Sequence, residues 1–198
     1  MMAGLPRHTH LEMVEARSIS VPDPAAAWTR LGFAVDGGAT RVGGVRIALG
    51  AAQLEVAAAG LAAERPDGLA LVHARDEAPG APPTHPNGAL VLDHVVALTD
   101  DLRRTVDALV AAGLELRRER APMAFLRLGE LILEVVQRDD AEPALWGLVV
   151  VVPDLGTLGP LVGEPKDAVQ PGRRIATVRR EAGLRTALAF MTPRFPTR

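Results

Sequence analysis

Hydrophobic and polar positions along the chain repeat one pattern, an apolar strand, an amphipathic helix and a glycine-turned hairpin. The first copy has a strand at 18–21 and a hairpin of 45–49 and 53–57 around Gly50. The second has a strand at 94–98, a helix that ends at Gly113, and a hairpin of 125–128 and 131–136 around Gly129. The third has a strand at 148–152, a short helix to about Gly163, and strands at 175–178 and 187–190 around Gly183. Such self-similarity predicts an α+β fold in which repeated βαβββ modules form curved mixed sheets.

These copies divide the chain. We place module one at 11–59, module two at 91–137 and module three at 145–193, with a strand at 69–73 and a Pro-rich linker filling 60–90. The connector at 138–143 is short, so we expect modules two and three to pair in one curved sheet that contains Val95 and Val149. Module one then has an open apolar face and sheet edge, which predicts either a homodimer or an intrachain cover by residues 60–90.

Local signals support the modules. Asp23 before Pro24, and Asp100 or Asp101, are typical caps of a following helix. In the strand at 130–137, one face is wholly apolar and the other carries Glu134, which suits a sheet covered by a helix on one side and lining a cavity on the other. The fifth residue after each hairpin glycine is Glu55, Glu134 and Leu188, so two modules keep an acid there.

Composition narrows the function classes. The chain has no cysteine, which excludes disulfides, thiolate catalysis and Cys-rich zinc sites and fits a cytoplasmic protein. Its net charge is −2 and only 3% of its residues are aromatic, which argues against a nucleic-acid surface. No apolar run is long enough to span a bilayer, and the N-terminus has no signal-peptide core. The expected partner is a small molecule.

The order of these segments resembles the vicinal oxygen chelate superfamily, which includes the glyoxalases, the bleomycin-resistance proteins and the extradiol dioxygenases. Segments 92–96 and 125–136 resemble a glyoxalase-like module, and segment 166–177 resembles a closing module of bacterial glyoxalase-like proteins. The resemblance covers residues 11–193. It implies that two modules pair about a pseudo-twofold axis and form a U-shaped cup.

The same resemblance implies a divalent metal site, because each module typically gives one ligand from its first strand and one from its last. Here it assigns His94 and Glu134 as metal ligands, with Glu55 as a third candidate and Glu134 as the proton-transferring catalytic group. Imidazole and carboxylate suit Zn, Ni, Mn or Fe(II). The matching positions in module three, Gly147 or Leu148 and about Leu188, cannot bind a metal, so the site is incomplete or the protein holds none.

Structural interpretations stay open for each residue. His94 is either a ligand or a satisfied polar residue, and Glu134 either binds metal or pairs with Arg127. Trp146 is placed to fill the space of a missing metal ligand. Arginines 173, 174, 179 and 180 flank the strand at 175–178, where Arg174 and its neighbours either capture an anionic ligand at the cup mouth or form a solvated edge.

Two function classes follow from the resemblance. In one, a metal-free cup holds a small oxygen-bearing ligand, as the resistance proteins do. In the other, a metal held by His94 and Glu134 polarises a carbonyl or enediolate in a lyase, isomerase or dioxygenase. The incomplete ligand set favours the metal-free cup, and the metal-dependent enzyme is the alternative.

Overall fold

The structure is a computed structural model that describes residues 13–75 and 80–194. Its strands form two mixed sheets, so the α+β prediction is confirmed. The five-stranded sheet has the order β2 (Ala39–Val42), β3 (Val45–Leu49), β1 (Glu15–Val21), β4 (Glu55–Ala59), β5 (Leu71–His73). The eight-stranded sheet has the order β11 (Lys166–Asp167), β12 (Arg174–Thr177), β13 (Ala187–Met191), β10 (Ala144–Val151), β6 (Val91–Thr99), β9 (Leu131–Gln137), β8 (Met123–Leu128), β7 (Glu115–Arg120). The α-helices are α1 (Ala25–Arg30) and α2 (Leu102–Ala111), and 3-10 turns occur at Pro66–Gly68, Leu155–Thr157 and Arg180–Ala182.

Each sheet is centred on two antiparallel strands, β6 with β10 in one and β1 with β4 in the other. Each of these four strands also pairs in parallel with a later strand of its own unit: β6 with β9, β10 with β13, β1 with β3, and β4 with β5. Val95 lies opposite Leu148 in the β6–β10 pair, so strands from the predicted modules two and three do share one sheet. The module boundaries themselves remain an interpretation.

The predicted hairpin around Gly50 is wrong. Strand β3 pairs with β2 across the turn at Gly43 and Gly44, whereas β4 crosses to the other side of β1. Strand β4 therefore begins a further unit with β5 instead of closing the first one. The predicted helix to about Gly163 is also wrong, since only the 3-10 turn at Leu155–Thr157 forms there.

Helix α2 begins as predicted, because the Asp101 carboxylate accepts a hydrogen bond from the Arg104 backbone N–H at 3.0 Å. Helix α1 does not. Asp23 is fully buried and its carboxylate accepts from Trp28 Nε1 at 3.1 Å and from the backbone N–H groups of Arg185 and Thr186 at 2.6 and 2.9 Å. Asp23 therefore ties the start of α1 to the loop before β13 instead of capping the helix.

The two sheets share one hydrophobic core, to which residues of α1, α2 and the 60–90 segment also contribute. Leu54 and Val56 lie in the segment predicted as module one, whose apolar face was expected to be open, and they are 7% and 0% exposed. Leu61, Leu69 and Leu71 are buried in the same cluster. The chain thus covers this face itself. A homodimer stays a prediction, but an open apolar face of module one no longer supports it.

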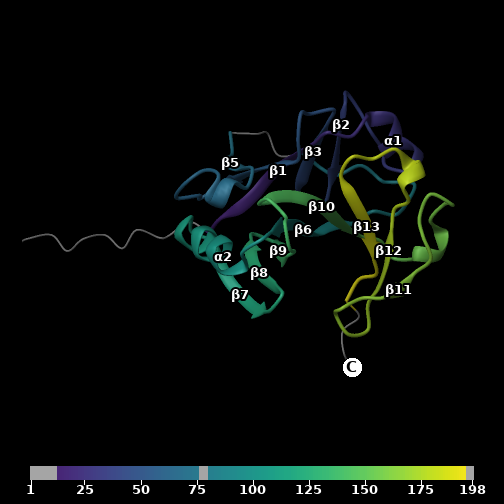
Figure 1. Ribbon diagram of the computed structural model, residues 1–198. Coiled ribbons are helices and arrows are strands. Elements are labelled where there is room, and N and C mark those ends of the chain that lie inside the picture. Colours follow the sequence, from purple (N-terminus) through teal and green to yellow (C-terminus); the bar gives the residue numbers. More distant parts are fainter. Residues whose placement is uncertain (1–12, 76–79, 195–198) are drawn as a thin grey trace, which may run out of the picture.

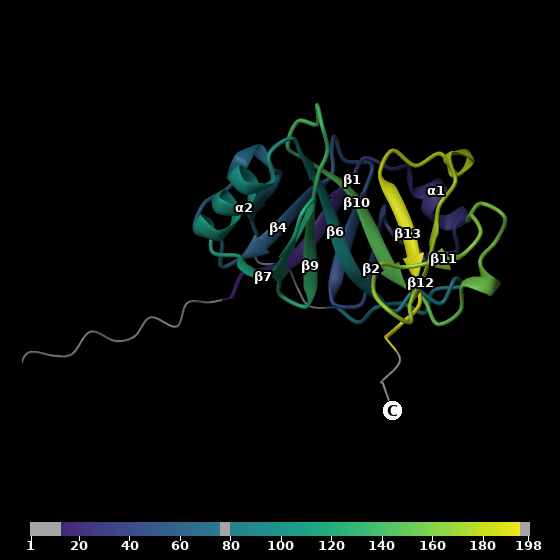
Figure 2. The same ribbon diagram turned by 60° about the horizontal axis from the view of Figure 1, so that its bottom comes forward.

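The eight-stranded sheet is curved (Figure 1). Strands β7 and β8 at one end and β11 and β12 at the other turn toward the same side, away from the five-stranded sheet, and Figure 2 looks toward that side. We call this side the open face. It carries the predicted site residues His94 and Glu134.

Candidate functional site

Strand register identifies the side chains of the open face, because directly opposite residues in neighbouring strands project on the same side. One row is Arg118, Phe125, Glu134, Val96, Gly147 and Ala187. The next row is Arg127, Ile132, His94, Val149, Ala189 and Thr177. Burial agrees with this assignment. In β9, for example, Leu131, Leu133 and Val135 are buried in the core, whereas Ile132, Glu134 and Val136 are only partly buried.

The structure brings His94 and Glu134 onto this face as diagonal neighbours. His94 lies opposite Ile132 in the β6–β9 pair, two residues from Glu134. The His94 side chain is buried, and its ring meets that of Phe125 edge-on at 6.4 Å. Among the described residues, the Glu134 carboxylate makes no hydrogen bond or ion pair.

Sequence reasoning missed Asp93 as a site residue. The β6–β10 register shifts between Leu92 and His94, so Asp93 is an extra residue in a β-bulge. Its carboxylate lies 2.6 Å from His94 Nδ1 and accepts both terminal nitrogens of Arg173 at 3.0 Å. Arg173 also donates through Nε to the Thr192 carbonyl at 2.7 Å, and its side chain is 2% exposed.

This network changes the acidity of two carboxyl groups. Burial raises the pKa of Asp93, but the contacts with His94 and Arg173 more than offset this and hold that pKa well below its usual range. Burial raises the pKa of Glu134, the negative charge of Asp93 raises it further, and a positive charge on His94 lowers it, with a net rise. Asp93 is thus a fixed anion, and Glu134 is the acid of this face that more readily holds a proton.

The other predicted residues lie elsewhere. Arg127 does not pair with Glu134, since its Nε lies 3.5 Å from Glu115 Oε2. Glu55 lies on β4 in the five-stranded sheet and contacts Arg65 at 3.5 Å, so the predicted three-ligand set with His94 and Glu134 does not assemble. Arg174 is exposed and donates to the Pro165 carbonyl. Trp146 is 48% exposed and is the extra residue of a bulge in β10.

Among the described residues, strands β10 and β13 carry no side chains that match His94 and Glu134 as metal ligands. The antiparallel pairing of β6 with β10 places His94 opposite Val149 and Val96 opposite Gly147, so the symmetric counterpart of His94 is Gly147. The counterpart of Glu134 is then Ala189, and not Leu188 as predicted, because Leu188 faces the core. A Cβ at Gly147 would lie 2.8 Å from the Ala187 carbonyl oxygen, so close backbone approach leaves no room for a side chain there.

The residues present therefore do not fit a resident metal. Within residues 13–75 and 80–194, no group of three or more His, Cys, Asp or Glu side chains is arranged to hold one. Asp93 is already bound to Arg173, which leaves His94 and Glu134 as two donors. Structural and catalytic zinc sites use at least three protein ligands.

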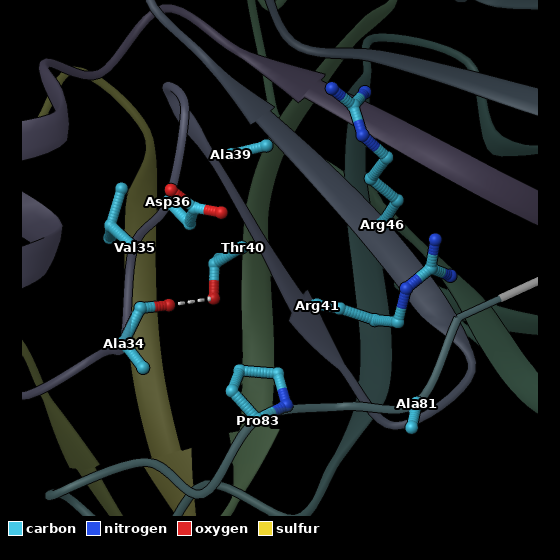
Figure 3. A pocket seen from close by; sticks show the side chains of 9 residues that line it. All are labelled: Ala34, Val35, Asp36, Ala39, Thr40, Arg41, Arg46, Ala81 and Pro83. Atoms are coloured by element: carbon cyan, nitrogen blue, oxygen red, sulfur yellow. Dashed lines mark hydrogen bonds between the residues drawn. The ribbon is translucent and has the colours of Figure 1, made fainter.

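A separate cavity of about 360 Å³ opens beside β2 (Figure 3). Its lining residues are Ala34, Val35, Asp36, Ala39, Thr40, Arg41, Arg46, Ala81 and Pro83. None of the site residues predicted from the sequence lies there. No signal in the sequence pointed to it, because its walls come from a loop, from strands β2 and β3 and from the segment after residue 80.

The fold is similar to that of a solved glyoxalase. The Mn(II)-bound glyoxalase from Novosphingobium aromaticivorans is 12% identical, with a TM-score of 0.60 over 92% of this chain and 82% of that one. Methylmalonyl-CoA epimerase from Mycobacterium tuberculosis is 15% identical, with a TM-score of 0.48 over 55% of this chain and 91% of that one. The sequence matches no protein-family model, and no curated protein is significantly similar to it. Among the described residues, no helix is both long and apolar enough to cross a bilayer.

Proposed function

We propose that this chain, which has the fold of the vicinal oxygen chelate superfamily, holds a small oxygen-bearing molecule on the open face of its eight-stranded sheet without a resident metal. The observation that carries the proposal is the network of Arg173, Asp93 and His94 beside Glu134. Buried titratable groups that lie together on one face of a sheet, with perturbed acidity, are candidates for a ligand site.

The network orients the polar groups. With Nδ1 of His94 held against Asp93, the other ring nitrogen, Nε2, is the atom that faces a ligand. The Glu134 carboxyl, whose pKa is raised, donates a hydrogen bond when protonated and accepts one when ionised. A carbonyl, hydroxyl or carboxyl oxygen matches both groups.

The rest of the open face has an apolar part and a cationic part. Val96, Val149 and Met191 form a small buried apolar cluster together with Ile175 and Ala189. At the opposite end, Arg118 lies in the same row as Glu134, on the fully exposed edge strand β7. The face therefore suits a molecule with an apolar part, a central oxygen and a negative charge toward β7.

A second candidate is a proton-transfer activity on that molecule, favoured by the raised pKa of Glu134. A general acid or base works best with a pKa near the working pH. Glu134 would give or take the proton at a carbon or oxygen beside the bound carbonyl, and His94 would hold that oxygen. The metal-dependent lyase, isomerase or dioxygenase implied by the resemblance is less well supported, because only two donors remain for a metal.

The test is NMR titration of untagged protein with pyruvate and acetoacetate, together with metal analysis. We expect saturable shifts at the amides of His94 and Glu134 in metal-free protein, lost in His94→Asn. Glu55→Gln, which changes an acid in the other sheet, is the matched control and should bind like the wild type. One tightly bound equivalent of metal that disappears in His94→Asn would contradict the metal-free site.

A further inference from the structure

The two ring nitrogens of His94 have different surroundings. The residue is 3% exposed, and its Nδ1 is closed off from solvent and lies 2.6 Å from the Asp93 carboxylate. Within residues 13–75 and 80–194, Nε2 makes no hydrogen bond. The ring itself meets Phe125, another residue of the open face, edge-on at 6.4 Å. Nε2 is therefore the ring atom that is left for a ligand.

The Asp93 carboxylate beside this ring acts only as a hydrogen-bond acceptor. Each of its two oxygens accepts from one terminal nitrogen of Arg173 at 3.0 Å. A guanidinium group is always charged and has donors alone, so this two-point contact holds Asp93 in its ionised form. Arg173 is fixed in turn, because its side chain is 2% exposed and its Nε donates to the Thr192 carbonyl at 2.7 Å.

These contacts determine which nitrogen of His94 carries the proton. A bare Nδ1 at 2.6 Å from the Asp93 oxygen would set two lone pairs against each other, so Nδ1 is the protonated nitrogen. In the neutral ring the other nitrogen then has no proton and only accepts. Nε2 thus offers a lone pair to the ligand. A hydroxyl group can donate to it, whereas the oxygen of a ketone cannot.

We propose that the open face selects short carboxylates that present a hydroxyl group to His94 Nε2 over the corresponding oxo acids. This inference rests on the proposed function and narrows its ligand class. The hydroxyl donates to Nε2, and the carboxylate lies toward Arg118 on β7. Asp93 and Arg173 do not touch the ligand. They are positioning residues, because they fix the ring and its proton.

The position of the proton is measured first, on the full chain without a ligand. In 15N-labelled protein at pH 7, the protonated and the bare nitrogen of a neutral imidazole have clearly different chemical shifts, and their couplings to the ring protons tell them apart. We expect the neutral His94 ring with its proton on Nδ1. A proton on Nε2, or on both nitrogens, would overturn the proposal.

The preference is measured with 3-hydroxybutyrate, acetoacetate and butyrate, which share one carbon chain and carry a hydroxyl, a carbonyl or no oxygen at the third carbon. Binding is followed by NMR at the amides of His94 and Glu134, with each enantiomer of 3-hydroxybutyrate separately. We expect the better enantiomer to bind about tenfold more tightly than acetoacetate, the effect of one hydrogen bond that the ketone leaves unmade. Butyrate should bind no better than acetoacetate.

The probes separate this inference from the proposed function. Equal binding of 3-hydroxybutyrate and acetoacetate, or tighter binding of acetoacetate, would overturn the hydroxyl preference and leave the proposed function standing. No saturable shift with any probe would overturn the proposed function and this inference with it.

Asp93→Asn tests the positioning role. Because Arg173 has only donors, the amide oxygen of the new side chain would face it and the amide NH2 would face His94 Nδ1. Nδ1 then accepts, Nε2 takes the proton, and the preference should reverse in favour of acetoacetate. Asp107→Asn, which removes the carboxylate of the exposed Arg103–Asp107 pair, is the matched control and should keep the wild-type preference. An unchanged preference in folded Asp93→Asn would overturn the proposal, and if that variant does not fold, the wild-type ring spectrum and the probe series decide.

Discussion

Replacing Arg173 with methionine should destabilise the protein substantially. The wild-type side chain is 2% exposed and gives three hydrogen bonds, two to Asp93 and one to the Thr192 carbonyl. Methionine fills a similar volume but leaves a largely buried carboxylate and a carbonyl without these donors. Breaking a buried ion pair in this way typically costs roughly 3–5 kcal/mol, and because Asp93 is 21% exposed we expect about 3 kcal/mol.

The measurement is urea unfolding at pH 7, with Arg103→Met as the control because Arg103 and Asp107 form an ion pair at the exposed surface of α2. The double variant Arg173→Met/Asp93→Leu should lose less than the sum of the single variants, since neither charge is then left alone. A loss from Arg173→Met no larger than that of the control would refute the buried network.

The same variant has a predicted pH dependence. The pKa of Asp93 is lowered in the folded protein, so its contribution to stability is present above the unfolded pKa of about 4 and is lost as the pH falls. Without Arg173 that pKa moves back upward. The difference in unfolding free energy between wild type and variant should therefore shrink as the pH is lowered from 7 to 3.

Three further substitutions have predicted effects on stability. Because burial raises the pKa of Glu134, its ionisation destabilises the fold as the pH rises, so Glu134→Gln should gain stability relative to the wild type between pH 4 and 8 in urea unfolding curves. Gly147→Ala should lower the melting temperature, at a cost of about 1–3 kcal/mol, because its Cβ meets the Ala187 carbonyl at 2.8 Å. Asp23→Ala removes an acceptor from Trp28 and two backbone groups and should cost at least about 3 kcal/mol, measured by the same unfolding assay.

The second unit was predictable because its signals are local. Asp101 caps α2, Gly113 follows the helix with a positive φ, and Gly129 turns β8 into β9. Each of these features depends on neighbours in the sequence. Strands β8 and β9 also alternate between core and open face, as predicted for the strand of Glu134, whereas His94 was assigned from the family resemblance.

The strand pairing predicted for the first unit was wrong because it depends on contacts between distant segments. Gly50 has a positive φ and does mark a turn, but the chain that follows pairs with β1 instead of β3. The next backbone N–H groups, of Gly50 and Ala51, bond to the carbonyls of Asp23 and Val21. Which strand a turn returns to depends on contacts between distant segments, so the local pattern misplaced Glu55.

The network of Asp93, His94 and Arg173 could not be predicted from the sequence, because it also depends on contacts between distant segments. Asp93 and Arg173 are 80 residues apart in sequence, and the bulge that turns Asp93 toward the open face arises only when β6 meets β10. The cavity beside β2 likewise needs Asp36, Arg41 and Pro83 to come together from separate segments. The sequence analysis named Arg173 among four arginines that flank the strand at 175–178, but not its partner Asp93.

If the open face lacks a metal because it lacks donors, then adding one donor should create a metal site. Val149 lies directly opposite His94 in the antiparallel β6–β10 pair, on the same face and with Glu134 as a diagonal neighbour of His94. Val149→His would supply a second imidazole next to the first and raise the donor count to three, the minimum for a catalytic zinc site. We expect this variant to bind Co(II), a spectroscopic substitute for zinc, at least tenfold more tightly than the wild type. Val149→Asn, which adds polarity without an imidazole, should not. Equal Co(II) binding by wild type and Val149→His would show that donor number is not what keeps metal from this face.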